Sequence, residues 1–136
     1  MDGIILTSLK KFLHPKGDIF HAMKVSDNGF NGFGEAYFST INKNDTKGWK
    51  KHTEMTLNLV VVIGEVEFII YDGDSFFNVK LSKKNYQRLT VRPGLWFAFR
   101  GLDNENIVLN LANIEHDLNE SENVDLDTFD YNWNKL

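Results

Sequence analysis

Cysteine is absent from the 136 residues, which excludes disulfide bonds, thiol catalysis and thiolate metal sites. No stretch of the chain approaches the roughly 20 consecutive apolar residues that a membrane-spanning helix needs. The acidic start at Met1–Gly3 and the short apolar run Ile4–Leu6 do not have the basic flank and the length of a signal peptide. We therefore expect a cytoplasmic protein with no membrane partner.

Positive charge is also scarce: 15 Lys and Arg face 19 Asp and Glu, for a formal net charge of −4. This balance argues against a nucleic-acid-binding surface as the main purpose of the chain. A local basic patch remains compatible with a phosphorylated small molecule. The length suits one compact domain, and no repeat, low-complexity tract or linker divides the chain. We expect a single domain over residues 1–136.

Short strands separated by turn residues dominate the pattern. Phe33–Ile41 mixes aromatic and β-branched residues, as a strand does. Leu57–Ile63 is β-branched, Gly64 interrupts it and Glu65–Tyr71 resumes, which predicts a β-hairpin. Further strands are predicted at Phe76–Leu81, Gln87–Arg92, Trp96–Phe99 and Ile107–Leu111. With no convincing amphipathic helix, the pattern predicts an all-β sandwich or barrel, and periodicity alone does not choose between the two.

The C-terminal tail, residues 115–136, is acidic and rich in Asn. It nevertheless carries the large apolar residues Leu118, Val124, Leu126, Phe129, Tyr131 and Trp133. A disordered tail does not usually hold so many such groups. We expect the tail to pack on the barrel or on a partner subunit.

Four ordered motifs carry a resemblance to a known family. They are GEAYFS at Gly34–Ser39, KGWKKH at Lys47–His52, RPGLWFAF at Arg92–Phe99 and DYNW at Asp130–Trp133. The set resembles the dTDP-4-dehydrorhamnose 3,5-epimerase-like cupins, which include nucleotide-sugar epimerases and ketoisomerases. The resemblance implies a cupin jelly-roll β-barrel and a homodimer. It also implies a dTDP-4-keto-6-deoxyhexose as ligand, with no cofactor and no metal.

The resemblance also implies a proton-transfer site, from which this sequence departs at two positions. In such enzymes a His of the second motif named above removes the proton beside the 4-keto group, and a Tyr returns or relays it. Lys50 stands at that His position, and Phe97 replaces the usual His of the following motif. His52 lies two residues after Lys50, on the same face of a strand, and suits a base near neutral pH. Tyr37 lies where related ketoisomerases place a functional Tyr.

The predicted catalytic set is therefore His52, Tyr37 and Lys50, and the role of Lys50 stays open. An ordinary lysine has a pKa of about 10.4 and acts as a base only when its surroundings lower that value by several units. Alternatively, Lys50 is a cation that stabilises the 4-keto oxygen, or it is a solvent-exposed residue that replaces the catalytic His in a domain without catalytic activity. His52 is alternatively a barrel-lining or surface residue of an inherited scaffold, and Tyr37 a core residue.

The predicted substrate-binding set contains five residues: Lys47, Trp49, Asn58, Arg92 and Trp96. Lys47 and Arg92 are candidates for the pyrophosphate, because charge-assisted contacts anchor phosphate oxygens. Trp49 and Trp96 either stack on a ring of the ligand or pack structurally. A bound metal is not expected. Among the His positions of the two cupin motifs, only His52 is still a His, so three converging N or O ligands cannot be assembled.

Three functional hypotheses follow. The leading one is a nucleotide-sugar epimerase or ketoisomerase that acts by metal-free proton transfer. The second is a non-catalytic sugar-nucleotide-binding cupin, which Lys50 in place of His favours. The third, a metal-dependent cupin, predicts stoichiometric metal in the purified protein.

Overall fold

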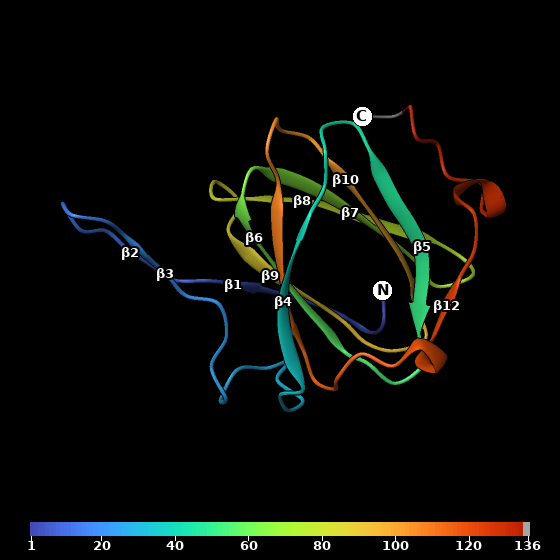
Figure 1. Cartoon of the computed structure of the whole chain (residues 1–136), viewed down its shortest axis with the longest axis horizontal. Helices are drawn as coiled ribbons and strands as arrows, with labels where there is room; N and C mark the ends of the chain where they lie inside the picture. Colours follow the sequence, from blue (N-terminus) through green and yellow to red (C-terminus); the bar gives the residue numbers. More distant parts are fainter. Residues whose placement is uncertain (135–136) are drawn as a thin grey trace.

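A computed structural model describes residues 1–134 and shows two five-stranded antiparallel sheets in one all-β domain (Figure 1). The first sheet has the order β1 (Ile4–Ser8), β9 (Gln87–Val91), β6 (Leu57–Ile63), β11 (Ile107–Ala112) and β4 (Glu35–Thr40). The second has the order β12 (Ser121–Asn123), β5 (Thr46–His52), β10 (Trp96–Gly101), β7 (Glu65–Tyr71) and β8 (Phe76–Ser82). A separate hairpin joins β2 (Lys11–Phe12) to β3 (Ile19–Phe20). The predicted all-β class is confirmed.

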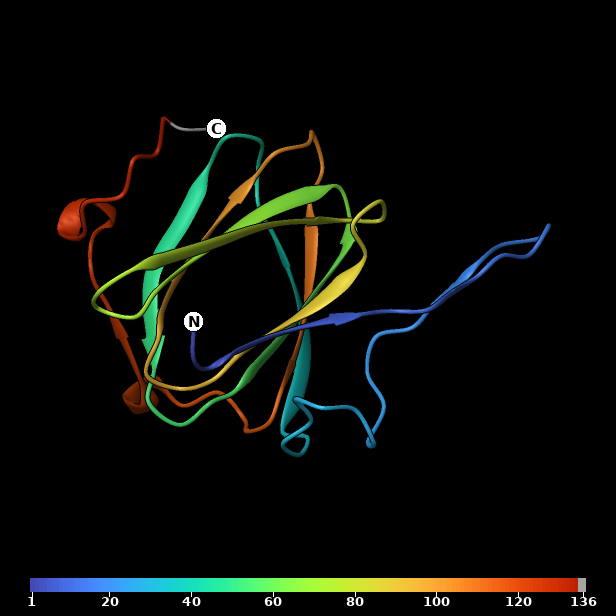
Figure 2. The same ribbon diagram turned by 180° about the vertical axis from the view of Figure 1, so that it is seen from behind.

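Alternating residues of both sheets point into the space between them and form the core. In β6 and β7, one face of each strand supplies the core residues Leu57, Leu59, Val61, Val66, Phe68 and Ile70. Burial of a side chain of this kind contributes about 1.5–3 kcal/mol relative to leaving it in water. The core therefore fixes which face of each strand points inward, and the view from behind shows the same two layers (Figure 2).

The seven predicted strands all exist, with bounds that differ by at most two residues, but the predicted hairpin at Gly64 is wrong. β6 belongs to the first sheet and β7 to the second, so the chain crosses between sheets at this glycine. Gly64 has a φ of 81°, and an added Cβ would lie 2.1 Å from the Glu105 carbonyl oxygen. The glycine therefore permits a tight corner, and sequence periodicity does not distinguish a corner from a hairpin turn.

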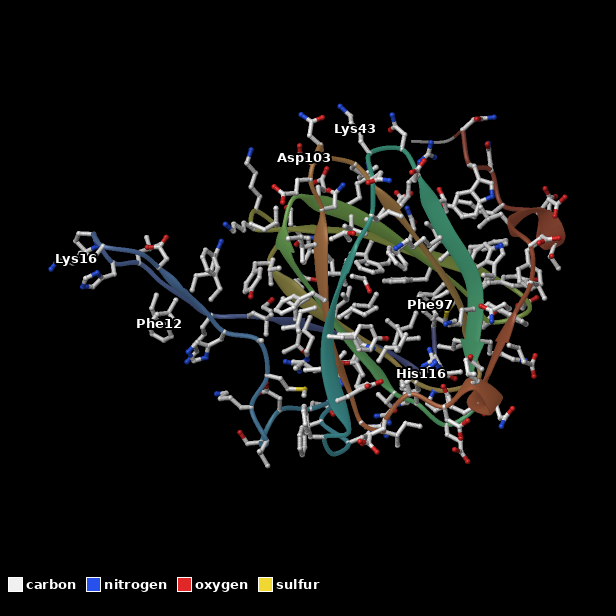
Figure 3. The ribbon with its side chains drawn as sticks, viewed as in Figure 1. Phe12, Lys16, Lys43, Phe97, Asp103 and His116 are labelled. Atoms are coloured by element: carbon white, nitrogen blue, oxygen red, sulfur yellow. The ribbon has the colours of Figure 1, made fainter. Side chains whose placement is uncertain are left out.

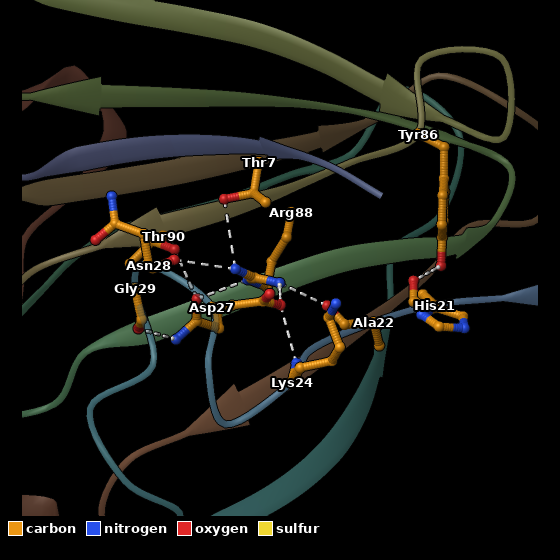
Figure 4. Close-up of polar contacts among 11 residues, drawn as sticks. Thr7, His21, Ala22, Lys24, Asp27, Asn28, Gly29, Tyr86, Arg88 and Thr90 are labelled. Atoms are coloured by element: carbon orange, nitrogen blue, oxygen red, sulfur yellow. Dashed lines mark hydrogen bonds and ion pairs between the residues drawn. The ribbon is translucent and has the colours of Figure 1, made fainter. Parts of the chain in front are cut away.

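A buried arginine ties the segment after β3 to the first sheet (Figure 4). The fully buried Arg88 of β9 donates to the Ala22 carbonyl at 2.8 Å, to Asp27 Oδ2 at 3.1 Å and to Asn58 Oδ1 at 3.1 Å. The Lys24 backbone amide and the Arg88 guanidinium hold the pKa of Asp27 below its usual value. This network anchors the base of the β2–β3 hairpin.

Replacement of this arginine tests that anchoring role. We expect Arg88→Met to lower the free energy of unfolding by about 3 kcal/mol, because it leaves Asp27 and Asn58 without their buried partner. Urea denaturation measures the change. Arg92→Met is the matched control: its side chain is exposed, and a change of less than about 0.5 kcal/mol is expected. Equal stability of Arg88→Met and wild type would show that the network does not hold the segment.

The described part of the tail, residues 115–134, crosses the outer face of the second sheet. It contains two short 3-10 helices, Leu118–Glu120 and Leu126–Thr128, which flank β12. Its large side chains pack around the buried Trp49, Ile69 and Ala98; they are Val124, Leu126, Phe129, Tyr131 and Trp133. Residues 135–136 of the predicted tail lie outside the described residues. Neither short helix is long and apolar enough to cross a membrane.

Candidate functional site

A cavity of about 600 Å³ lies between the two sheets. The first sheet contributes Tyr37 from β4 and Asn110 from β11, while β5 of the second sheet contributes Lys50 and His52. The remaining lining residues are Glu35, Ser39, Lys47, Gly48, Leu57, Leu59, Phe68, Phe97, Phe99, Val108, His116 and Asn123. Polar groups on facing sheets thus meet around an otherwise apolar interior, as in most small-molecule sites.

A buried carboxylate fixes the orientation of His52. Nδ1 of His52 contacts Oε1 of Glu120, and both residues are buried. Oε2 of Glu120 accepts hydrogen bonds from the backbone amides of Glu54 and Met55, each at 3.1 Å. An ionised carboxylate only accepts hydrogen bonds, so Nδ1 carries the proton and Nε2 keeps its lone pair. Since Nδ1 is held by Glu120, Nε2 is the nitrogen available to a ligand.

The surroundings of this pair favour a neutral imidazole beside a charged carboxylate. Burial lowers the pKa of His52 below the ordinary value of 6.5, and the neighbouring Glu120 opposes this effect only in part. The positive charge of Lys50 and the nearby His116 lower it further. Burial acts to raise the pKa of Glu120, but the contacts with His52, Met55 and Glu54 hold it below 4.5. His52 is therefore an unprotonated base at neutral pH.

A chain of amides orients Tyr37 on the opposite side of the cavity. Asn110 Oδ1 accepts a hydrogen bond from the Asn58 backbone amide at 3.1 Å, so its Nδ2 points the other way. Nδ2 donates to the Tyr37 hydroxyl oxygen at 3.0 Å. Because Tyr37 accepts this bond, its own O–H hydrogen is free to donate to a ligand. The phenol is thus presented as a proton donor.

Lys47 and Phe97 complete the polar and aromatic surroundings. Nζ of Lys47 donates to the Thr40 carbonyl at 2.7 Å and stands 5.9 Å from the centre of the Phe99 ring. Phe97 stacks on His52, with ring centroids 5.9 Å apart and an angle of 14° between the planes. The phenyl ring of Phe97 therefore packs against the remaining imidazole. Figure 3 labels Phe97 and His116, which both line the cavity.

The structure brings four of the predicted site residues to the cavity: His52, Tyr37, Lys50 and Lys47. Trp49 and Trp96 belong to the outer aromatic cluster under the tail. Arg92 is exposed outside the cavity. Asn58 is buried on the other face of β6, where its side chain bonds to Arg88, Thr90 and Gly29. Period-two geometry explains this placement, because Leu57 and Leu59 take the inward positions.

The predicted site did not include Asn110, Glu35 and His116, which line the cavity, or Glu120, which contacts His52. Glu120 lies 68 residues after His52 along the chain, and no motif spacing connects the two. Asn110 interrupts the apolar strand Ile107–Leu111, a signal for a buried polar role. Glu35 lines the cavity, and its Oε1 is buried without a hydrogen-bond partner. Within residues 1–134, no three His, Asp or Glu side chains gather as a metal-ion site does.

The two facing sheets and the cavity between them define a cupin-type domain. Residues 2–130 match the family model described as "FdtA: WxcM-like, C-terminal", and the chain belongs to this family. The nucleotide-sugar cupin group predicted from the motifs is thereby confirmed. No curated protein sequence matches the chain.

Solved structures similar to the chain include sugar-nucleotide isomerases and epimerases. A dTDP sugar isomerase from Desulfovibrio desulfuricans G20 superposes with a TM-score of 0.93 at 28% identity, covering 99% of this chain and 93% of that one. The 3,4-ketoisomerase QdtA from Thermoanaerobacterium thermosaccharolyticum, as a mutant in complex with TDP-4-keto-6-deoxyglucose, gives 0.80 at 19% identity, with coverages of 90% and 88%. The epimerase RmlC from Legionella pneumophila gives 0.81 at 16% identity, with coverages of 93% and 74%.

Proposed function

We propose that this protein isomerises a dTDP-4-keto-6-deoxyhexose by moving a proton between carbons next to the ketone. The observation that carries the proposal is a neutral His52, fixed by Glu120, that faces the donor Tyr37 across one cavity. The similarity to a dTDP sugar isomerase over nearly the whole chain supports the same class of substrate. A 3,4-ketoisomerase is the form of this reaction that we favour.

The proposed reaction needs only groups that the cavity already holds. Nε2 of His52 takes the proton from C3, and the electron pair of the C–H bond moves to form an enediolate with charge on O4. Tyr37 donates its proton to O4 and receives the proton of the C3 hydroxyl. The proton on Nε2 of His52 exchanges with water before it is delivered to C4, which leaves a ketone at C3. Atoms and charge balance without a cofactor or a metal.

Lys50 fits the role of a cation beside the developing enediolate. It lies on the same face of β5 as His52 and lines the cavity. A fixed positive charge near O4 stabilises the transition state more than the neutral ketone. The same charge lowers the pKa of His52, so Lys50 also keeps the base unprotonated. Lys47, on the same wall, is the proposed contact for the pyrophosphate.

Product analysis tests the proposal. We expect wild-type protein incubated with dTDP-4-keto-6-deoxyglucose to form the 3-keto isomer, identified by NMR of the sugar. Inversion at C3 or C5 with the ketone still at C4 would assign epimerisation instead. Recovery of unchanged substrate from a protein that binds it would contradict catalysis.

That last outcome would support the second candidate, a non-catalytic sugar-nucleotide-binding protein. Lys50 and Phe97 favour it, because both replace imidazoles that the resemblance places at these positions. Calorimetry with the substrate separates binding from turnover. Binding of the substrate without product formation, in both wild type and Lys50→His, would identify a non-catalytic sugar-nucleotide-binding protein.

Tyr37→Phe tests the donor. We expect kcat to fall by about 10²-fold or more, since general acid catalysis contributes 10²–10⁴-fold, while substrate binding stays within a few-fold of wild type. Steady-state kinetics measures both. Tyr86→Phe is the matched control, because its hydroxyl donates to the His21 carbonyl outside the cavity, and it should retain wild-type kcat. An unchanged kcat in Tyr37→Phe would remove the phenol from the mechanism.

We further infer a cytoplasmic homodimer without metal, in which the tail is an integral part of the domain. The tail contains Glu120, which contacts His52, and strand β12, which pairs with Lys50–His52 of β5. Asn123 of β12 also lines the cavity. The site therefore depends on the tail for its geometry.

A further inference from the structure

Glu35, the first residue of β4, is a cavity residue to which the proposed reaction gives no role. Among residues 1–134, its Oε1 is buried and has no hydrogen-bond partner. No Lys, Arg or His side chain of the described residues forms an ion pair with this carboxylate. Buried polar atoms of native proteins are almost always hydrogen-bonded, so an exception needs a specific explanation.

The backbone around Glu35 is closely packed and fixes where the carboxylate starts. The Gly34 amide donates to the Ala112 carbonyl at 2.8 Å, and Ala112 is the partner of Glu35 in the β4–β11 register. An added Cβ on Gly34 would lie 2.1 Å from the carbonyl carbon of Ile114. A glycine in a strand often marks such a close approach of two backbones. Glu35 is therefore presented to the cavity by a paired strand and not by a loose loop.

One face of β4 carries Glu35 next to the proposed proton donor. Glu35, Tyr37 and Ser39 alternate along the strand and all line the cavity, as do residues of β5 in the other sheet (Figure 1). Successive residues on one face of a strand are about 6.7 Å apart, which is comparable to the width of a sugar ring with its hydroxyl groups. A sugar that meets Tyr37 at its ketone therefore has neighbouring hydroxyl groups within reach of Glu35.

The ammonium group of Lys47 lies at the opposite end of β4 from Glu35. Nζ of Lys47 donates to the carbonyl of Thr40, the last residue of β4, and five steps of extended strand span about 17 Å. With the pyrophosphate at Lys47, as proposed above, the anionic part of the ligand stays away from the Glu35 carboxylate. The part of the ligand nearest Glu35 is then the sugar, whose hydrogen-bond donors are its hydroxyl groups.

We propose that Glu35 is a specificity residue that accepts a hydrogen bond from a ring hydroxyl, at C2 or C3, of the sugar. This inference rests on the proposed function and deepens it, because it requires a substrate that keeps this hydroxyl. When the ligand displaces water from the cavity, the hydroxyl supplies the donor that Oε1 lacks. A ligand without the hydroxyl leaves the carboxylate buried and unpaired, so the site discriminates against it.

Calorimetry with matched ligands tests this role. The ligands are dTDP-4-keto-6-deoxyglucose, its 2-deoxy and 3-deoxy analogues, and dTDP alone. We expect Glu35→Ala to weaken binding of the full substrate by about 10-fold or more, because a hydrogen bond to a charged group is lost. Binding of dTDP should change by less than about three-fold, since its charges are distant and screened. One deoxy analogue should bind wild type and Glu35→Ala alike, which identifies the hydroxyl.

Two further variants separate recognition from a structural effect. Glu35→Gln keeps an acceptor oxygen without the charge, so its affinity for the full substrate should lie between those of wild type and Glu35→Ala. Glu105→Ala is the matched control: Glu105 is exposed in the turn between β10 and β11, and its removal should change no affinity.

The outcomes that would overturn the proposal are distinct from failure of the proposed chemistry. Equal affinity of Glu35→Ala and wild type for the full substrate would remove the hydrogen bond. Equal weakening for dTDP and for the full substrate would place the carboxylate at the nucleotide instead. Every measurement is of binding, so absence of turnover would contradict the proposed reaction and leave this test intact. Absence of substrate binding in wild type would overturn both.

Discussion

His52→Asn should reduce turnover of the dTDP-4-keto-6-deoxyhexose by about 10³-fold or more, because a general base contributes up to about 10⁴-fold and His52 is the cavity imidazole that the buried Glu120 orients. Burial keeps the pKa of His52 below 6.5, so the wild-type imidazole is neutral at pH 7 and its replacement changes no charge. Binding of substrate should therefore stay within a few-fold of wild type. Steady-state kinetics and calorimetry separate the two effects.

The matched control for this variant is His21→Asn. His21 lies outside the cavity, where its ring packs 5.0 Å from Phe12. Its replacement should leave kcat unchanged. Comparable activity of His52→Asn and wild type would eliminate His52 as the base.

The pH dependence of wild type follows from the same lowered pKa. Activity requires unprotonated His52, so kcat/KM should be constant above the pKa and fall as the pH drops through it. Because burial lowers this pKa, the acid limb should lie below pH 6.5. A limb clearly above pH 6.5 would contradict the proposed environment of the imidazole.

Glu120→Gln should lower kcat by roughly 10³-fold with little change in KM, because an amide at this position selects the wrong tautomer. The single amide oxygen must accept from the Glu54 and Met55 backbone amides, which turns the NH₂ group toward Nδ1 of His52. Nδ1 then has to accept, so the proton moves to Nε2 and the base is lost. Glu120 thus acts as a positioning residue.

A pH profile and a control variant separate this role from simple destabilisation. Loss of the negative charge lowers the pKa of His52 further, so the residual activity of Glu120→Gln should show an acid limb at lower pH than wild type. Glu122→Gln is the matched control: its exposed carboxylate pairs with Lys51 at 3.5 Å on the outer side, and kcat should not change. Full activity in Glu120→Gln would show that the carboxylate does not set the tautomer.

The sequence predicted the strands and half of the site for identifiable physical reasons. β-branched runs and period-two alternation located β6 to β11, and the same alternation put Lys50 and His52 on one face. Alternation did not predict the position of Asn58. We assigned this polar residue of β6 to ligand binding, whereas its side chain hydrogen-bonds with Arg88 and Thr90. Alternation along one strand does not show which face meets the cavity.

Glu120 shows a second reason why part of the site could not be predicted from the sequence. Its contact with His52 depends on the tail returning along β5, where β12 pairs Ser121 with His52. Such pairing between distant segments leaves no local pattern in the chain. The corner at Gly64 was missed for a related reason, because the choice between hairpin and sheet crossing is made by partners elsewhere in the sequence.

Deuterium incorporation tests most directly whether His52 removes a sugar proton. Wild-type protein is incubated with dTDP-4-keto-6-deoxyglucose in deuterated water, and mass spectrometry and NMR locate the label in the sugar. We predict one deuteron on a ring carbon of the isomerised sugar, with at least about 10³-fold slower incorporation in His52→Asn. Tight binding of the sugar nucleotide with no label in any ring carbon would contradict the account.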